Sequence, residues 1–215
     1  MTRVFLIPGL GADHRIYKNL QFPGYDVINI SWIDPQEGDT LADYAQKLID
    51  HYQITAGAVV VGNSLGGMLA IEIAKKLQLQ KTLLISSIKT KSEAPVSHHW
   101  YRRIPVYKLL PAGLFPSLGV FVKFAFGKMN KDDQWLFVDM LEKTPPYFAK
   151  WALGAILHWD NQTIPQNVFH IHGNRDLVFP YRRLKDARIV EGGSHIMVLN
   201  RPSEINAWIK SLFYS

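Results

Sequence analysis

Short runs of apolar residues alternate along the chain with stretches in which apolar residues recur at helical spacing. Runs rich in Val, Ile and Leu predict buried strands at residues 3–7, 25–32, 59–61, 81–87, 167–172 and 187–191. Apolar positions on one helical face predict helices over 41–52, from residue 65 onward, and over 202–213. Strands that alternate with helices are typical of a doubly wound sheet. We therefore predict an α/β fold with a mostly parallel sheet of about six strands.

The alternation is interrupted between residues 88 and 160. This segment carries 13 of the 26 aromatic residues, several prolines, and helix-like apolar stretches at 118–126 and 135–141, but no strand pattern. Parallel sheets bind ligands outside the carboxyl ends of their strands, where this insertion leaves the sheet. We predict a core of residues 1–87 and 161–215 and a helical cap of residues 88–160. A helical subdomain that only buries its aromatic residues against the sheet is the alternative.

A tight strand-to-helix turn lies between the third predicted strand and the helix after it. The apolar run at 59–61 stops at Gly62 and helix formers begin at Leu65, so the chain reverses within the segment G-N-S-L-G. Such a turn predicts a strained backbone at Ser64 and a projecting hydroxyl. Side chains at Gly62 and Gly66 would collide where strand and helix cross. The pattern is that of a G-x-S-x-G nucleophile elbow, and a purely structural turn is the alternative.

The elbow and its flanking elements resemble the α/β-hydrolase superfamily, and the resemblance covers nearly the whole chain. The predicted sheet lacks the first two antiparallel strands of the usual members. This resemblance implies a triad in the order serine, acid, histidine, with the acid and the histidine each after a strand. The segment G-N-R-D-L-V-F-P resembles the acid loop of the family and contains Asp176, and the segment G-G-S-H contains His195. The resemblance thus implies that Ser64 attacks, His195 acts as base and Asp176 orients His195.

Other residues compete for these roles. Asp160 and Glu191 are alternative acids, and an ion pair with a neighbouring arginine is the alternative role for Asp176. The histidines that precede the elbow or lie in or near the predicted cap are His14, His51, His98, His99 and His158. His170 and His172 alternate along a strand and face the same side, which predicts packing. No carboxylate or cysteine stands at ligand spacing from this pair, so we predict no metal.

Attack on an ester also requires two N–H donors where negative charge develops on the carbonyl oxygen. The resemblance implies that the backbone of Leu65, the residue after the nucleophile, supplies one of them at a helix N-terminus. The second is expected from the Leu10 amide, in the loop P-G-L-G after the first strand. The chain lacks the histidine that family members often carry in this loop, which leaves Gly11 as the alternative donor. Three nearby residues are interpreted first as core or surface residues and second as pocket walls: His14, Tyr17 and Trp32.

Composition narrows the class of protein further. The residues are 47% hydrophobic with no low-complexity tract, which excludes a disordered chain. The net charge of +6 comes from scattered lysines and arginines, so we predict no nucleic-acid partner. The absence of cysteine excludes disulfides, thiolate metal sites and a cysteine nucleophile. No apolar run is long enough for a signal peptide or a membrane span, so we expect a cytoplasmic chain without membrane insertion.

Together these features predict a serine hydrolase that acts on a small molecule and uses no cofactor. The expected substrate is a carboxylic ester or a thioester with an apolar acyl or aryl group, because an aromatic cap gains from burying apolar area. Three alternatives use the same scaffold: acyl transfer to an alcohol, hydrolysis of a carbon–carbon bond, and ligand binding without catalysis. A serine at the elbow argues against haloalkane dehalogenases and epoxide hydrolases, which resemble this fold but carry aspartate there.

Overall fold

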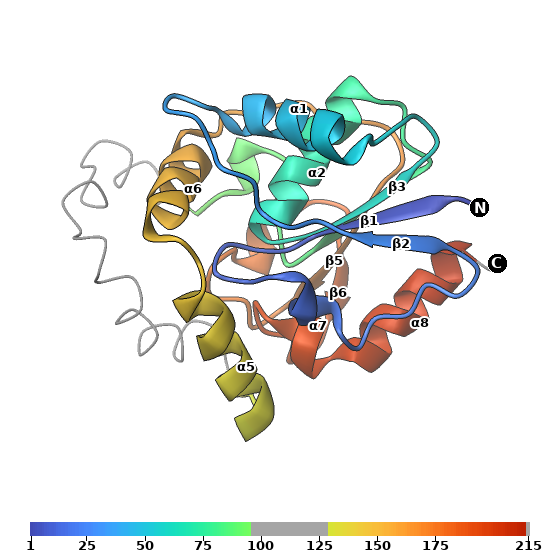
Figure 1. Cartoon of the computed structure of the whole chain (residues 1–215). Coiled ribbons are helices and arrows are strands. Elements are labelled where there is room, and N and C mark those ends of the chain that lie inside the picture. The colour runs from blue at the N-terminus through green and yellow to red at the C-terminus, as the bar shows by residue number, and fades with distance from the viewer. Residues whose placement is uncertain (96–128, 214–215) are drawn as a thin grey trace.

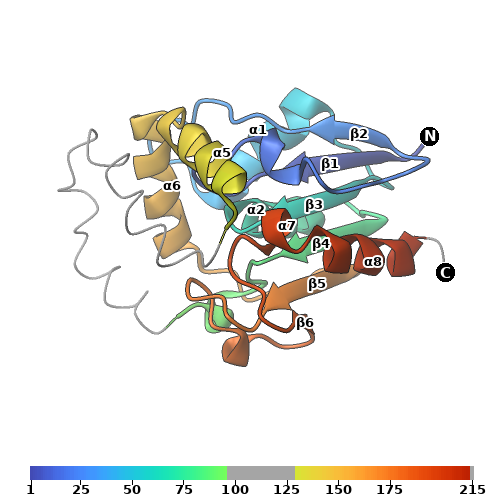
Figure 2. The same ribbon diagram turned by 90° about the horizontal axis from the view of Figure 1, so that it is seen from below.

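The computed structural model describes residues 1–95 and 129–213, which form a central sheet with helices on both faces (Figure 1). Within these residues the strands are β1 Arg3–Ile7, β2 Asp26–Asn29, β3 Val59–Asn63, β4 Lys81–Ile85, β5 Val168–Gly173 and β6 Arg188–Val190. Their order across the sheet is β2-β1-β3-β4-β5-β6, and neighbouring strands pair in parallel (Figure 2). The predicted parallel sheet is confirmed in this part of the chain.

Helices cover the two faces of the sheet. They are α1 Leu41–Tyr52 and α2 Leu65–Lys76 on one face, and α7 Met197–Asn200 and α8 Pro202–Phe213 on the other (Figure 1). Short 3₁₀ helices are η1 His14–Tyr17, η2 Lys91–Glu93 and η6 Tyr181–Arg183. The helix α1 begins where predicted, because the Thr40 hydroxyl accepts from the Asp43 amide and the Asp43 carboxylate accepts from the Thr40 amide. Among the described helices, none is both long and apolar enough to cross a membrane.

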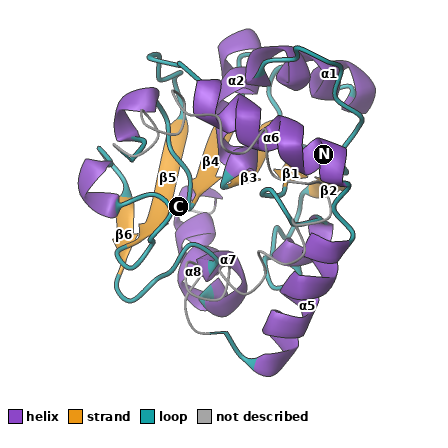
Figure 3. Cartoon of the chain, turned by 90° about the vertical axis from the view of Figure 1, so that its left-hand side faces the viewer, coloured by secondary structure: helices purple, strands orange, loops and turns teal. Residues whose placement is uncertain are grey.

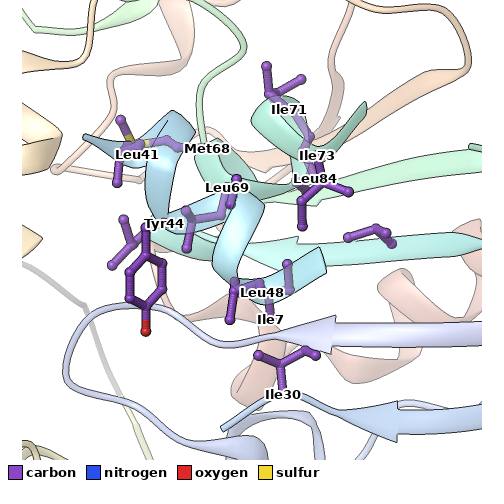
Figure 4. Packing of buried hydrophobic residues seen from close by; sticks show 14 of the residues in the cluster. Ile7, Ile30, Leu41, Tyr44, Leu48, Met68, Leu69, Ile71, Ile73 and Leu84 are labelled. Carbon is purple, nitrogen blue, oxygen red and sulfur yellow. The ribbon is translucent and has the colours of Figure 1, made fainter. Parts of the chain in front are cut away.

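The alternation of side chains along the strands divides the core into two clusters. Phe5 and Val60 face α1 and α2, whereas Val4 and Val59 face α8. Figure 4 shows the first cluster, in which the labelled side chains of the two helices are Leu41, Tyr44, Leu48, Met68, Leu69, Ile71 and Ile73. Because each fully buried aliphatic side chain contributes about 1.5–3 kcal/mol relative to exposure, packing on both faces fixes the strands that carry the site.

The second strand is shorter than predicted. It ends at Asn29 rather than at residue 32. The reason lies in α1: the amides of Ser31 and Ile33 donate to the hydroxyls of Tyr52 and Tyr44, at 2.8 and 3.0 Å. These amides are therefore satisfied by tyrosine side chains and not by a neighbouring strand.

Left-handed backbone conformations set three other strand ends. Ser86, with φ 49°, turns the chain out of the sheet, so β4 ends at Ile85 rather than at residue 87. Asn167, with φ 58°, delays the start of β5 by one residue. Asp186, with φ 50°, comes just before β6, which spans three residues rather than the predicted five. Few residues other than glycine adopt a positive φ, and asparagine and aspartate are among those that do.

Two helices of the predicted cap lie within the described residues. They are α5 Lys131–Glu142 and α6 Pro146–His158, and both stand at the carboxyl ends of the strands (Figure 3). The helix predicted at 135–141 is confirmed as part of α5. The helix predicted at 118–126 lies outside the described residues. The division of the chain into core and cap stays a prediction.

The helices α5 and α6 pack against different faces of the sheet. Phe148 and Ala152 of α6 belong to the cluster that faces α1 and α2. Phe137 and Met140 of α5 belong to the cluster that faces α8. The two helices therefore extend both layers of the core past the ends of the strands, on either side of the turn that carries Ser64.

Candidate active site

Ser64 stands between β3 and α2 with φ 53° and ψ −118°. This backbone conformation is unfavourable for a residue with a side chain. It is maintained because strand and helix cross too closely for another path. A Cβ on Gly62 would lie 2.1 Å from the carbonyl oxygen of Gly66, and a Cβ on Gly66 would lie 2.0 Å from that of Ile7. The predicted strain at Ser64 and the predicted need for two glycines are confirmed.

The end of β4 holds the backbone of this turn. The amide of Ser64 and the side-chain amide of Asn63 both donate to the carbonyl of Ile85, at 3.0 and 3.2 Å. The hydroxyl of Ser87 donates to the carbonyl of Ser64 at 2.7 Å. The sequence analysis did not identify Ser87 as part of the site. Gly67 was the one hint in the sequence, since a glycine at the start of a helix indicates a close neighbour. In the structure this neighbour is Ser87, whose hydroxyl oxygen would lie 2.4 Å from a Cβ on Gly67.

The structure brings the three predicted side chains into one hydrogen-bonded chain. Nε2 of His195 lies 2.9 Å from Oγ of Ser64, and Nδ1 of His195 lies 2.8 Å from Oδ2 of Asp176. Asp176 comes after β5 and His195 after β6, so both side chains reach Ser64 from neighbouring strand ends. Both residues are 4% exposed. Little water therefore competes for the hydrogen bonds between them.

Asp176 accepts hydrogen bonds on both carboxylate oxygens. Its Oδ1 accepts from the amides of Val178 and Phe179 at 2.8 and 2.9 Å, and its Oδ2 lies 3.2 Å from Nε2 of His172 as well as against His195. Burial raises the pKa of Asp176, but its interactions with His195 and His172 and the hydrogen bond from the Phe179 backbone outweigh the effect of burial and hold the pKa below its ordinary value. The carboxylate is therefore ionised. Within the described residues it forms no ion pair with an arginine.

The segments that carry Asp176 and His195 cross with their backbones in contact. A Cβ on Gly173 would lie 2.1 Å from the carbonyl oxygen of Gly193. The same carbonyl accepts a hydrogen bond from the amide of Arg175 at 2.9 Å. The main chain thus fixes the position of acid and histidine relative to each other. The two glycines are what allows this approach.

The first turn of α2 presents backbone amides next to Ser64. The amides of Gly67 and Met68 donate to the carbonyl of Ser64 at 2.9 and 3.3 Å. The amide of Leu65 precedes them, at the position where a helix has no carbonyl of its own to satisfy an N–H group. It lies at the positive end of the helix dipole. An anion that forms at Ser64 would be stabilised there.

The loop after β1 lies against the other side of Ser64. The Cβ position of Gly9 is 3.2 Å from Cβ of Ser64, so the backbone on either side of Gly9 is close to the serine. Gly11, with φ 78°, faces α5, because a Cβ there would lie 2.8 Å from Cδ1 of Leu141. Of the two residues between which the sequence left the second N–H donor open, Leu10 is therefore the one adjacent to the residue that packs on Ser64.

The side chains of Tyr17 and Trp32 hold this loop by hydrogen bonds to backbone carbonyls. The hydroxyl of Tyr17 donates to the carbonyl of Ile7 at 2.6 Å, and Nε1 of Trp32 donates to the carbonyl of Ala12 at 3.0 Å. Tyr17 is buried and Trp32 is half-buried, whereas His14 is exposed. Tyr17 is therefore a core residue and His14 a surface residue, and for Trp32 both interpretations stay open.

His170 and His172 form a buried pair beside the site. Their ring centroids are 5.4 Å apart at an interplanar angle of 84°, which confirms that they pack on one face of β5. Burial lowers the pKa of each histidine, most strongly that of His170, whereas the charge of Asp176 and the Phe179 carbonyl partly oppose this effect at His172. Within residues 1–95 and 129–213, no cluster of three or more His, Asp or Glu side chains could hold a metal ion.

The remaining candidates have ordinary surroundings. Asp160 is exposed and lies 3.4 Å from the ammonium of Lys91, and Glu191 is exposed. The exposed histidines are His14, His51 and His158. His98 and His99 lie outside the described residues.

A groove of about 880 Å³ opens between α1, α2 and α6. Its walls include Glu72, Lys75, Lys150, Trp151 and Trp159. Ser64, His195 and Asp176 do not line this groove. The groove is therefore separate from the site that these three residues form.

Solved structures similar to this chain share its fold. A hydrolase from Pseudomonas aeruginosa PA01 aligns with a TM-score of 0.79 at 16% identity, over all of this chain and 90% of its own. A thermophilic esterase from Thermogutta terrifontis aligns with a TM-score of 0.74 at 17% identity, over 99% of this chain and 89% of its own. The enol-lactonase from Burkholderia xenovorans LB400 aligns with a TM-score of 0.74 at 16% identity, over all of this chain and 92% of its own.

The family comparison rests on sequence. No curated protein sequence matches this chain. A model of the alpha/beta hydrolase family matches residues 4–208, a range that includes Ser64, Asp176 and His195. The match spans all the strands described above except the first residue of β1. The chain therefore belongs to the alpha/beta hydrolase family.

Proposed function

We propose that the protein is a serine hydrolase that cleaves a carboxylic ester or a thioester of a small apolar acyl or aryl substrate through an acyl-enzyme. One observation carries the proposal: Ser64 Oγ is linked through His195 to Asp176 by contacts of 2.9 and 2.8 Å. A serine hydroxyl is a poor nucleophile unless a base within hydrogen-bond reach takes its proton. Membership in the alpha/beta hydrolase family supports hydrolysis as the reaction class.

In the first half of the reaction, Oγ of Ser64 attacks the carbonyl carbon while its proton passes to Nε2 of His195. Nδ1 of His195 keeps its own proton, because the atom opposite it is the carboxylate oxygen of Asp176. The Nε2 lone pair is therefore the one that faces Ser64. Collapse of the tetrahedral intermediate breaks the bond to the leaving oxygen or sulfur. His195 then returns the proton to the leaving alcohol or thiol.

In the second half, a water molecule attacks the acyl group on Ser64. His195 takes a proton from the water through the same Nε2 atom. The second tetrahedral intermediate expels Oγ of Ser64, which regains the proton from His195. The products are the free acid and the original enzyme, so the steps balance without a cofactor.

Negative charge on the carbonyl oxygen is stabilised in both halves by backbone amides. We assign these donors to Leu65 and Leu10. Leu65 stands at the positive end of α2, and Leu10 follows the glycine that packs on Ser64. Gly11 is the weaker candidate because it faces Leu141 of α5.

An aromatic cluster beside the loop that carries Leu10 favours an apolar substrate. The ring of Trp32 lies 4.8 Å from that of Phe148, and the ring of Tyr44 lies 4.4 Å from that of Trp151. Leu10 is half-buried and packs against the core cluster that contains Phe148. Tyr44 and Phe148 are 0% and 1% exposed and therefore support the loop, whereas Leu10 and Trp32 are half-buried and are the apolar side chains that we expect an acyl or aryl group to contact. The esterase and the enol-lactonase with a similar fold bear names that indicate ester cleavage.

The decisive test is a Ser64→Ala variant compared with wild type and with Ser203→Ala, a change at an exposed serine. Wild type and Ser203→Ala should hydrolyse p-nitrophenyl esters and should be labelled by a fluorophosphonate probe. Ser64→Ala should do neither while it keeps the wild-type circular dichroism spectrum. A wild-type protein that is neither labelled nor active would point to a ligand-binding protein. Esters of graded acyl length, with and without an added alcohol, would separate hydrolysis from acyl transfer.

A further inference from the structure

A second histidine contacts the carboxylate that holds His195. Nε2 of His172 lies 3.2 Å from Oδ2 of Asp176 and 2.8 Å from the carbonyl oxygen of Phe179. The side chains of His172 and Asp176 are both 0% exposed. His172 belongs to β5, whereas Asp176 and Phe179 belong to the segment that follows this strand. The ring of His172 therefore lies between the backbone of β5 and the carboxylate of Asp176.

The contacts of His172 define where its proton lies. Both partners of Nε2, a carboxylate oxygen and a carbonyl oxygen, accept hydrogen bonds, so Nε2 must carry the proton. Nδ1 is buried and has no hydrogen-bond partner in the part of the chain that the structure describes. A proton on Nδ1 would thus be buried and unsatisfied, which disfavours the charged ring. His172 is a neutral donor that hydrogen-bonds to the Phe179 carbonyl, and the same nitrogen lies 3.2 Å from Oδ2 of Asp176.

His172 also reaches the catalytic histidine by a second route. The amide of Phe179 donates to Oδ1 of Asp176 while its carbonyl accepts from His172. The ring of Phe179 stands edge-on against the ring of His195, with centroids 5.6 Å apart at 66°. Phe179 is therefore held at both main-chain polar atoms and packs on the base. A change at residue 172 acts on both neighbours of His195.

We propose that His172 is a positioning residue of the reaction, a fixed neutral donor that holds the Phe179 backbone, whose amide in turn holds the Asp176 carboxylate that orients His195. This inference rests on the proposed serine-hydrolase function and extends it beyond the three predicted side chains. Groups that fix a carboxylate from behind determine both its direction and the share of its charge that is left for the base. Without His172, the Phe179 carbonyl would lose this hydrogen bond, and Oδ2 of Asp176 would lose the N–H group that lies 3.2 Å from it.

The test compares His172→Leu with His172→Gln and His170→Leu. Leucine removes the donor. Glutamine restores it, because its amide nitrogen stands as many bonds from Cβ as Nε2 of histidine does. His170→Leu is the matched control, on the same strand, on the same face and equally buried. Each variant is titrated with a fluorophosphonate so that kcat is given per reactive serine, and kcat/KM for a p-nitrophenyl ester is measured from about pH 5 to about pH 8.

For His172→Leu we expect kcat to fall by about 3- to 10-fold with little change in KM, which is the effect of losing one buried hydrogen bond, here the bond to the Phe179 carbonyl. The acid limb of its profile should move to higher pH by about half a unit to one unit, because a carboxylate that has lost the His172 N–H group 3.2 Å from Oδ2 stabilises the His195 imidazolium more strongly. The groups that face His172 from the packed elements are Asp176, His195, Glu93 and His170. His172→Gln should restore both values, and His170→Leu should leave the acid limb in place.

Three results would overturn the inference: an unmoved acid limb in His172→Leu, an equal displacement in His170→Leu, or a displaced limb in His172→Gln. If His172→Leu does not fold, His172→Met makes the same comparison, because it is a flexible apolar side chain without a donor. A wild-type protein with no ester turnover and no labelling would overturn the proposed function. An active wild type with an unaltered His172→Leu profile would overturn this inference alone.

Discussion

The two segments that flank Ser64 are held in place by different kinds of contact. On one side, the segments with Asp176 and His195 are joined by crossing glycine backbones and by hydrogen bonds between fully buried groups. On the other side, the loop after β1 (residues 8–18) is held to α5 by ion pairs near the surface. The contacts that hold the segments with Asp176 and His195 are therefore protected from solvent. The ion pairs that tie the loop with Leu10 to α5 are accessible to solvent.

Arg15 and Lys18 of the loop after β1 each form an ion pair with α5, and Arg15 also pairs with Asp13 of the loop itself. Arg15 lies 2.6 Å from the carboxylate of Asp139, and Lys18 lies 2.8 Å from that of Asp133. The Arg15 side chain is 29% exposed and the Lys18 side chain 39%. Salt screens such pairs far more than it screens buried ones. His195, the proposed base, is therefore positioned by the core itself, while the loop with the proposed N–H donor of Leu10 is also tied to a helix of the predicted cap.

The largest expected effect is that of Asp176→Asn on the buried side. Asparagine can still accept from the amides of Val178 and Phe179 through its carbonyl oxygen, so the fold should be retained. Its NH₂ group would then face His195 and would require the other tautomer, with the proton on Nε2. We expect kcat to fall by about 10³- to 10⁴-fold. Ester hydrolysis per labelled serine measures the loss.

Asp160→Asn is the matched control for this change, because Asp160 is exposed and the sequence offered it as an alternative acid. It should keep wild-type activity, as should Glu191→Gln. An Asp176→Asn protein within tenfold of wild type would show that the buried carboxylate does not orient the base. A large loss in either control would move the role of the acid to that residue.

The patterns that predicted the fold and the three side chains are local in sequence. A buried run that ends in Gly-x-Ser-x-Gly fixes the place of Ser64, because the crossing of strand and helix follows from a few neighbouring residues. Asp176 and His195 each follow a strand, and the carboxyl ends of parallel strands lie at the same edge of the sheet. The position of each residue just after a predicted strand was therefore enough to expect all three side chains at that edge.

Contacts between elements that are distant along the chain could not be predicted in this way. His172 was predicted to pack, and it does, but its hydrogen bond to Phe179 and its contact with Asp176 depend on how the segment after β5 folds back onto the strand. Ser87 contacts Ser64 because β4 ends at Ile85 and the positive φ of Ser86 then turns the chain. The ion pair of Arg15 with Asp139 depends on where α5 is placed, more than one hundred residues later in the chain.

A second prediction concerns the free energy of unfolding at low pH, which the two buried histidines beside Asp176 should decrease. His170 and His172 are neutral in the folded state because burial lowers the pKa of each below its ordinary 6.5. The unfolded chain binds these protons as the pH falls through 6.5, so the free energy of unfolding should decrease from there downward, by about 1.4 kcal/mol per pH unit for each fully neutral histidine. Asp176, whose pKa is lowered from 3.8, adds its own loss only at still lower pH.

Urea unfolding at about pH 7 and about pH 5 measures this slope. His170→Leu should flatten the slope, since it removes the most strongly shifted histidine. The control is His51→Leu, at an exposed position of α1, which should keep the wild-type slope. A stability that stays constant between the two pH values would show that neither buried histidine is held neutral by the fold.

The smallest expected effect tests the exposed side of the comparison. Arg15→Met keeps the aliphatic stem but removes the contacts with Asp13 and Asp139. We expect kcat/KM to fall by about two- to fivefold at low salt, the range that exposed ion pairs supply. The difference from wild type should disappear between about 0.05 and about 0.5 M NaCl, because salt already weakens the pair in wild type.

Arg188→Met, at an exposed position of β6, removes the same charge from the far edge of the sheet and controls for net charge. It should leave kcat/KM unchanged at either salt concentration. If Arg15→Met behaves like Arg188→Met, the ion pairs with α5 do not position the loop after β1. The bracing of that loop would then rest on Tyr17 and Trp32, whose buried hydrogen bonds salt does not reach, and the two sides of Ser64 would be held alike.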